Sequence, residues 1–198
     1  MCRLFITAKD NYSAIDSTKV NLCFVSDDGT EFYFLDTSDA DDVIGDLYRV
    51  EMKDGEPEKP KLFDSDVCTV GISMCENGKM MYYKDVKENK NIGDFYMDKS
   101  KVDYDVYIGS PTYAKTIDSV VYFTDYDEMD EKGTLRIYDG KESSKISDDV
   151  HSFRVSRGDA ILYTYDYSTT YFRGDLYIFE SGEKRKLDMD VTYIFYIY

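Results

Sequence analysis

The stretch Val120-Val121-Tyr122-Phe123-Thr124-Asp125 decides the fold class of this 198-residue chain. Four apolar or aromatic side chains follow one another without a polar break, which is typical of a strand covered on both faces. A turn signal at Asp118-Ser119 precedes the stretch, and a polar loop follows it until Gly133 opens a second apolar run. The segment therefore predicts a buried strand, a loop and a partner strand.

The same order of signals occurs four times in the chain. An aromatic strand closes on aspartate in each copy, as Tyr33-Phe34-Leu35-Asp36, Tyr82-Tyr83-Lys84-Asp85, Tyr122-Phe123-Thr124-Asp125 and Tyr163-Thr164-Tyr165-Asp166. A glycine then opens the next strand, at Gly45, Gly93, Gly133 and Gly174. Each copy ends with a lysine-led strand that closes on Asp-Val, over 61–67, 101–106, 145–150 and 186–191. The closing aspartates of the aromatic strands lie 49, 40 and 41 residues apart, which indicates a repeat of about 40 residues.

This recurrence predicts an all-β protein, a β-propeller of four-stranded antiparallel blades within a single domain over 1–198. A β-sandwich would give no reason for one motif to return at one period. The predicted blades cover 20–66, 67–105, 106–149 and 150–190. Residues 1–19 are expected to form the third and fourth strands of a partial blade, and 191–198 the first strand of another.

The two partial blades leave two alternatives open. They can combine into a split fifth blade that closes the ring, because a closed ring has no exposed sheet edge along its circumference. The chain can equally be a piece of a longer array.

The strands should be short and almost no helix should form. They are expected near 20–26, 31–36, 46–52, 68–75, 79–85, 94–98, 120–125, 134–139, 151–156, 160–166, 175–180 and 192–197.

Charge narrows the class of partner. The formal net charge is −16 and the pI about 4.4, so nucleic acid and anionic membrane surfaces should repel the chain. The longest uncharged apolar run, 191–198, is far too short to cross a membrane. Basic proteins or peptides, glycans and calcium remain as ligands.

The four cysteines, Cys2, Cys23, Cys68 and Cys75, are expected to be free thiols. Cys68 and Cys75 are expected to lie seven residues apart on one strand, which would separate their Cα atoms by ~23 Å. A disulfide requires Cα atoms within about 7 Å of each other.

Few residues suggest catalysis. His151 is the single histidine and is expected to be an ordinary strand residue, which makes a zinc site improbable. Arg173-Gly174-Asp175 spells an adhesion tripeptide, but the repeat already explains Gly174. The irregular run at Asp39, Asp41 and Asp42 is the one calcium candidate, through carboxylate oxygens.

The loops that follow the second and fourth strands of each repeat should meet on one face. This face should be acidic, and its carboxylates are Asp39, Asp41, Asp42, Asp64, Asp66, Asp103, Asp105, Asp127, Glu128, Asp130, Glu131, Asp148, Asp149, Asp188 and Asp190. The opposite turns carry Lys53, Lys79, Lys141 and Lys184 and should be more basic. Each repeated aspartate can alternatively serve only its own turn, as aspartate commonly does.

The tetrapeptides resemble the Tyr-Trp-Thr-Asp propeller repeats of lipoprotein receptors and TolB-like repeat proteins of Gram-positive bacteria. Tyr122-Phe123-Thr124-Asp125 is the nearest copy, with phenylalanine where the family has tryptophan. The resemblance implies a propeller stabilised by the repeated Tyr and Asp, and it suggests a cell-surface or extracellular setting. It departs from the family because the chain has no tryptophan and is shorter than a six-bladed ring.

These patterns favour a non-catalytic binding or scaffolding module for a protein, peptide or glycan. The alternative is a carbohydrate-active enzyme that uses an Asp/Glu pair at the mouth of the ring. Fold alone does not choose between them.

Overall fold

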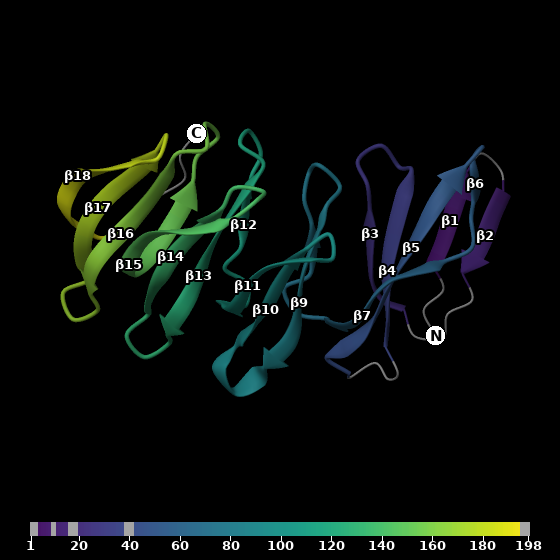
Figure 1. The fold of residues 1–198 in the computed structure, drawn as a ribbon, viewed down its shortest axis with the longest axis horizontal. Coiled ribbons are helices and arrows are strands. Elements are labelled where there is room, and N and C mark those ends of the chain that lie inside the picture. Colours follow the sequence, from purple (N-terminus) through teal and green to yellow (C-terminus); the bar gives the residue numbers. More distant parts are fainter. Residues whose placement is uncertain (1–3, 9–10, 16–19, 38–41, 195–198) are drawn as a thin grey trace. The chain divides into compact units, whose positions relative to one another are not determined.

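The computed structural model describes residues 4–8, 11–15, 20–37 and 42–194. They form an all-β protein whose strand pairs are antiparallel (Figure 1). The chain divides into two compact units, Met1–Lys101 (unit 1) and Val102–Tyr198 (unit 2), and the division falls inside β11 (Ser100–Tyr107). No helix in the described part of the chain is long and apolar enough to cross a membrane.

Unit 1 contains a hairpin and two further groups of strands. The hairpin consists of β1 (Leu4–Ala8) and β2 (Asn11–Ile15). The first group runs β3–β4–β5, with β6 and β7 both paired to β5; the bounds are β3 (Val20–Val25), β4 (Glu31–Thr37), β5 (Ile44–Lys53), β6 (Glu56–Pro57) and β7 (Lys61–Cys68). The second group consists of β8 (Ser73–Met74), β9 (Met80–Lys87) and β10 (Ile92–Met97), with the 3-10 turn η1 (Glu88–Lys90) between the last two.

Unit 2 is a longer succession of antiparallel strands. Its strands after β11 are β12 (Thr112–Ala114), β13 (Ser119–Asp127), β14 (Lys132–Tyr138), β15 (Ser143–Val155), β16 (Ile161–Ser168), β17 (Arg173–Glu180) and β18 (Glu183–Val191). The first part of β15 pairs with β14 and the second part with β16, and the two parts meet at Val150. One continuous strand therefore ends one set of four strands and begins the next.

Apolar side chains of successive repeats pack together inside each unit. In unit 1, Leu35 and Leu47 of the first repeat are buried with Met80 and Tyr82 of the second. In unit 2, Phe123 of β13 is buried with Phe153, and their rings meet edge to face at 5.2 Å. Burial on both sides explains why the strands are apolar at successive positions.

The expected strands are found with two differences. The strand expected over 68–75 is only β8, because β7 ends at Cys68 and a turn follows. The strand expected over 192–197 is not formed at 192–194, and its remainder lies outside the described residues. Cys68 and Cys75 therefore do not share a strand, although both are free thiols, as is Cys23.

A structural feature of the repeats that sequence reasoning missed is the backbone of their aspartates. Asp85, Asp125 and Asp166 close the aromatic strands with φ of 51°, 50° and 49°. The aspartates of the Asp-Val ends also have positive φ, with 58° at Asp66, 49° at Asp105, 51° at Asp149 and 55° at Asp190. Aspartate tolerates this left-handed region better than most side chains. The strand register shifts beside such an aspartate, which identifies β-bulges. The shifts occur in the pairings β5–β7, β9–β10, β13–β14, β14–β15, β16–β17 and β17–β18.

The repeated glycines have a steric reason rather than a positive φ. A Cβ on Gly174 would lie 2.9 Å from both the carbonyl oxygen of Tyr165 and the Cα of Tyr167. A Cβ on Gly133 would lie 2.9 Å from the Tyr126 ring, and one on Gly45 would lie 2.6 Å from the carbonyl oxygen of Asp36. At each of these three glycines the strand runs too close to the preceding strand for a side chain.

The first repeat is shifted by one residue relative to the alignment made from sequence. Tyr82, Tyr122 and Tyr163 pair with the third residue after the repeat glycine, whereas Phe34, not Tyr33, does so in the first copy. Asp36 has no positive φ and lies in a regular part of the β4–β5 pairing. Tyr33 is buried like the others but is not their equivalent, because aromatic residues at three adjacent positions leave the register ambiguous in the sequence.

Candidate functional site

The candidate site lies between two hairpin turns of unit 1. The first turn, 26–30, joins β3 to β4, and the second, 76–79, joins β8 to β9. Gly29 and Gly78 have φ of 68° and 80°, the left-handed conformation that such tight turns need. In the second turn the Cys75 amide donates to the Lys79 carbonyl at 2.8 Å, and the Asn77 side chain accepts the Lys79 amide at 3.1 Å.

Asp28 fixes the conformation of the first turn. Its Oδ1 accepts the Ser26 hydroxyl at 2.7 Å, the Thr30 amide at 3.0 Å and the Thr30 hydroxyl at 2.7 Å. These hydrogen bonds, that from Ser26 first, lower the pKa of Asp28 to about 2. Asp28 is therefore a structural carboxylate and a poor proton donor.

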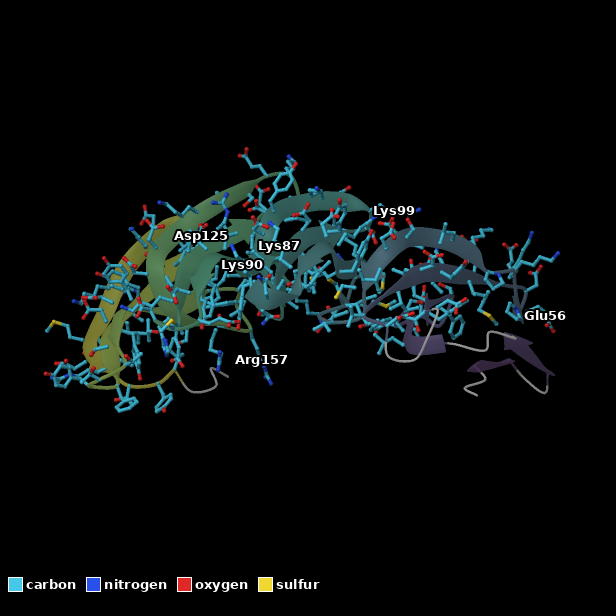
Figure 2. All side chains as sticks on the ribbon, turned by 90° about the horizontal axis from the view of Figure 1, so that it is seen from below. Glu56, Lys87, Lys90, Lys99, Asp125 and Arg157 are labelled. Carbon is cyan, nitrogen blue, oxygen red and sulfur yellow. The ribbon has the colours of Figure 1, made fainter. Side chains whose placement is uncertain are left out.

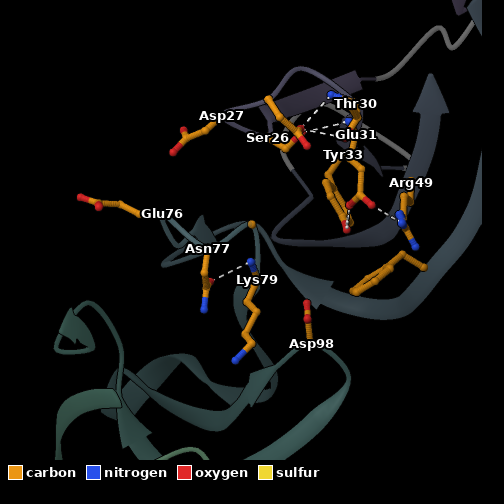
Figure 3. Close-up of a pocket in the computed structure, with 13 residues that line it drawn as sticks. Ser26, Asp27, Thr30, Glu31, Tyr33, Arg49, Glu76, Asn77, Lys79 and Asp98 are labelled. Atoms are coloured by element: carbon orange, nitrogen blue, oxygen red, sulfur yellow. Dashed lines mark hydrogen bonds and ion pairs between the residues drawn. The ribbon is translucent and has the colours of Figure 1, made fainter. Parts of the chain in front are cut away.

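Between the turns is a cavity of about 510 Å³ that is open to solvent. Thirteen residues surround it, namely Ser26, Asp27, Asp28, Thr30, Glu31, Tyr33, Arg49, Phe63, Glu76, Asn77, Gly78, Lys79 and Asp98 (Figure 3). They include five carboxylates but only two cations. Asp27 and Glu76, both exposed, extend from the two turns on the same side of the cavity (Figure 3).

One of the two cations is already neutralised. Arg49 forms an ion pair with Glu31 and a second one with Glu51 at 3.4 Å. Glu31 also accepts the Tyr33 hydroxyl at 2.9 Å, and burial of the ring raises the pKa of Tyr33. The cavity is therefore acidic around Asp27, Glu76 and Asp98, with Lys79 as the other positive charge.

Aromatic rings provide the apolar part of the cavity. Tyr33 and Phe63 meet edge to face at 5.2 Å. Phe63 also carries the Lys99 ammonium 4.6 Å from its ring centroid, a cation–π contact. The wall thus combines carboxylates with a ring that already accepts a cation.

A second acidic pocket, of about 300 Å³, lies in unit 2. Asp125, Asp127 and Asp130 line it from β13 and the following loop, and Asp148 and Asp149 from β15. Here the structure gathers the loops after the second and fourth strands, as the sequence predicted. Lys145 and Thr134 bond to Asp148, at 2.9 and 3.2 Å, and lower its pKa.

The expected calcium candidate is not tested by the structure. Asp39 and Asp41 lie outside the described residues, and Asp42 lies just before β5. Among the described residues no group of three His, Cys, Asp or Glu could hold a metal ion. Calcium at this loop stays a prediction.

The expected separation of acidic and basic faces is wrong for unit 1. Lys79 shares its turn with Glu76 and its cavity with Asp27. Lys87 ends β9 and Lys90 lies in the connection that follows, which was expected to be acidic (Figure 2). The separation failed because turns expected to be basic also carry carboxylates and this connection also carries lysine.

Two other sequence candidates have structural roles. The His151 ring stacks on Tyr167 at 4.0 Å, and its Nδ1 lies 2.9 Å from the Glu131 carbonyl oxygen. Arg173-Gly174-Asp175 opens β17, where Asp175 forms an ion pair with Lys186 at 2.6 Å. The repeat accounts for both positions.

The repeated tyrosines join consecutive repeats. Tyr82 donates its hydroxyl to Asp64 of the preceding repeat at 2.6 Å, and Tyr122 donates to Asp103 at 2.8 Å. A cation accompanies each pair, with Lys84 on Asp64 at 3.0 Å and Arg136 on Asp103 at 2.9 Å. Tyr82, Tyr122 and Tyr163 are at most 1 % exposed, which confirms their predicted burial. The partners at Asp64 and Asp103 were not predicted, because they lie 18 and 19 residues away in the chain.

Comparison with known proteins identifies no family for this chain. No family model matches the sequence, and no curated protein does. A puromycin hydrolase structure matches with 10% identity and a TM-score of 0.48, over 88% of this chain and 29% of its own. The acylaminoacyl peptidase of Pyrococcus horikoshii matches with 14% identity and a TM-score of 0.48, over 90% of this chain and 33% of its own. The chain spans a third or less of these structures, so their activities are not transferred to it.

Proposed function

We propose that this chain is a non-catalytic binding module of the β-propeller type, and that its unit 1 cavity binds basic peptide segments. The propeller assignment is supported by the recurring strand order, and by β15, which ends one set of four strands and begins the next. The binding assignment depends on one observation, the cavity between the two turns with its excess of carboxylates over cations.

A basic side chain suits the cavity for two reasons. A guanidinium can pair with Asp27 or Glu76, since arginine binds carboxylates through its planar set of donors. Tyr33 and Phe63 also line the cavity and provide apolar surface for the stem of a basic side chain. Carboxylates of exposed turns also raise the association rate of a cationic ligand.

Catalysis is less well supported than binding. A glycoside hydrolase of the usual kind needs one carboxyl group whose pKa is raised, so that it can act as an acid. Among the described residues, the carboxyl groups with displaced pKa values are all displaced downward; they are Asp28, Asp64, Asp139 and Asp148. This supports the binding module over the enzyme.

The test is a fluorescence titration with a labelled peptide that contains two adjacent arginines. The same peptide with citrulline in place of arginine has the same shape without the charge and should bind much more weakly. The double substitution Asp27→Asn, Glu76→Gln should weaken binding of the arginine peptide by about tenfold, or ~1.4 kcal/mol.

The matched control removes the same charge elsewhere. The control variant is Glu180→Gln with Glu183→Gln, at the exposed last residue of β17 and the exposed first residue of β18 in unit 2. This control should leave affinity nearly unchanged. Equal losses in both double variants would show that the peptide responds only to the net charge of −16, and the proposal would fail.

A further inference from the structure

The strands of the last repeat, β16, β17 and β18, expose one face to solvent. The equivalent face of the preceding repeat is buried. Ile146 in the first part of β15 is 6 % exposed, because it packs in the cluster that includes Phe153 and Tyr163 of the following repeat. Leu187 holds the equivalent place in β18 and is 40 % exposed. Leu162 and Leu176 are half-buried, whereas their equivalents Val121 and Leu135 are completely buried.

Asp188 lies on this face, two residues before the Asp-Val end of its repeat. Asp64 and Asp103 hold the equivalent position in the first two repeats. The Oδ1 of Asp188 accepts the amide of the next residue at 2.8 Å, as Asp64 and Asp103 do at 2.9 Å. At Asp64 and Asp103 the other oxygen, Oδ2, accepts a tyrosine hydroxyl from the following repeat, whereas the third inner copy has Ser147 at this position. Asp188 is exposed, and its carboxylate is held in the orientation that receives a phenol.

We propose that this face, formed by β16, β17 and β18, docks a further four-stranded repeat of the same kind, whose tyrosine hydroxyl donates to Asp188. The occupant is inferred from continuity with interfaces that the structure already contains, the pairs Asp64–Tyr82 and Asp103–Tyr122. A first repeat like that of this chain is a poor occupant, because Phe34 stands at the tyrosine position and has no hydroxyl. The docking face is separate from the unit 1 cavity and does not depend on the function proposed for it.

The experiment adds the occupant to the chain. Residues 1–191 are followed by a second copy of residues 151–191, so that the junction repeats the natural sequence around Asp149 and Val150. The extended protein should unfold in one transition at a higher temperature than the parent. Asp188→Ala should lower the melting temperature of the extended protein by several degrees more than that of the parent, in which only the exposed bond to the Met189 amide is lost.

A second variant distinguishes the contribution of the tyrosine hydroxyl from that of apolar packing. Phenylalanine in place of the first tyrosine of the added copy should lower the melting temperature, and adding Asp188→Ala should then have little further effect. An added copy that unfolds on its own, or an Asp188→Ala shift that is equal in parent and extended protein, would overturn the proposal.

If the extended protein fails to fold, the parent decides the question. A peptide of residues 151–168 added to the parent should shift the methyl resonances of Leu187, and its Tyr163→Phe form should shift them less. Leu187 shifts that follow the concentration of the parent alone would make a second copy the occupant and refute the proposal. Unchanged Leu187 resonances would refute it as well.

Discussion

Seven aspartates of the repeats adopt a left-handed backbone conformation that their sequence positions alone do not reveal. Nine other non-glycine residues of the described part of the chain have positive φ, among them Asp54, Asp98 and Asp118, so this region is also used away from the repeat positions. At the bulges the aspartate takes the place of glycine, since its short polar side chain can adopt positive φ at moderate cost. The main role of the repeated aspartate is thus to adopt the left-handed backbone conformation, and its negative charge is secondary.

Asp149 tests this account at the residue scale. Asp149→Gly should leave the free energy of unfolding nearly unchanged, because glycine adopts a φ of 51° without strain. Asp149→Ala should lower it by about 1 kcal/mol, since alanine is disfavoured there. Urea denaturation measures both variants, and equal stabilities would contradict the backbone role.

The repeat glycines give a second prediction at this scale. Gly174→Ala should destabilise the protein by about 1–3 kcal/mol, because the new methyl group would press on the backbone of Tyr165 and Tyr167. Gly158→Ala is the matched control, since the nearest atom to its Cβ would be the Ser156 hydroxyl at 3.9 Å. A thermal melt in which both variants lose the same stability would argue against the close approach of the two strands.

Between elements, the hydroxyls of Tyr82 and Tyr122 each connect the second strand of their repeat to the last strand of the repeat before it. Burial, followed by the charge and hydrogen bond of Asp64, raises the pKa of Tyr82. Burial also raises the pKa of Tyr122, and the charge of Asp103 adds to this effect. A raised folded-state pKa means that the folded protein holds the phenolic proton more tightly than the unfolded chain.

This difference predicts alkaline unfolding. The contribution of each buried tyrosine is complete below pH ~10, the pKa of an unfolded tyrosine, and is lost as the pH rises toward the folded-state value. Tyr82→Phe should therefore make stability fall less steeply above pH ~10, whereas Tyr171→Phe, at an exposed site, should not change the slope. Urea denaturation at several alkaline pH values measures the slope. Identical slopes in the two variants would contradict the buried hydroxyl pairs.

At the scale of the whole chain, the sequence predicted the strands well and their partners poorly. The recurring glycine and aspartate signals are local, so they predicted most of the strands and the burial of Tyr82, Tyr122 and Tyr163. The register of the first repeat was wrong because it depends on which of Tyr33 and Phe34 pairs with Tyr48, and both are aromatic. The unit 1 cavity was missed because its two turns are separated by about fifty residues and carry no shared motif.

The two acidic pockets make competing predictions about where a basic ligand binds. The pocket of unit 2 has five aspartates, but Lys145 already pairs with Asp148 and backbone amides bind Asp127. The cavity of unit 1 adds aromatic rings to its carboxylates and has the larger volume. We therefore expect a basic ligand to bind in the unit 1 cavity rather than in the unit 2 pocket.

The most direct test is a titration of isotope-labelled protein with the diarginine peptide, followed by the backbone amide resonances. We expect saturable shifts of the amide resonances of residues 26–31, 76–79 and 98, and much smaller shifts at residues 125–134 and 148–149. Shifts centred on the unit 2 pocket, or spread over acidic residues throughout the chain, would contradict a binding site between the two turns.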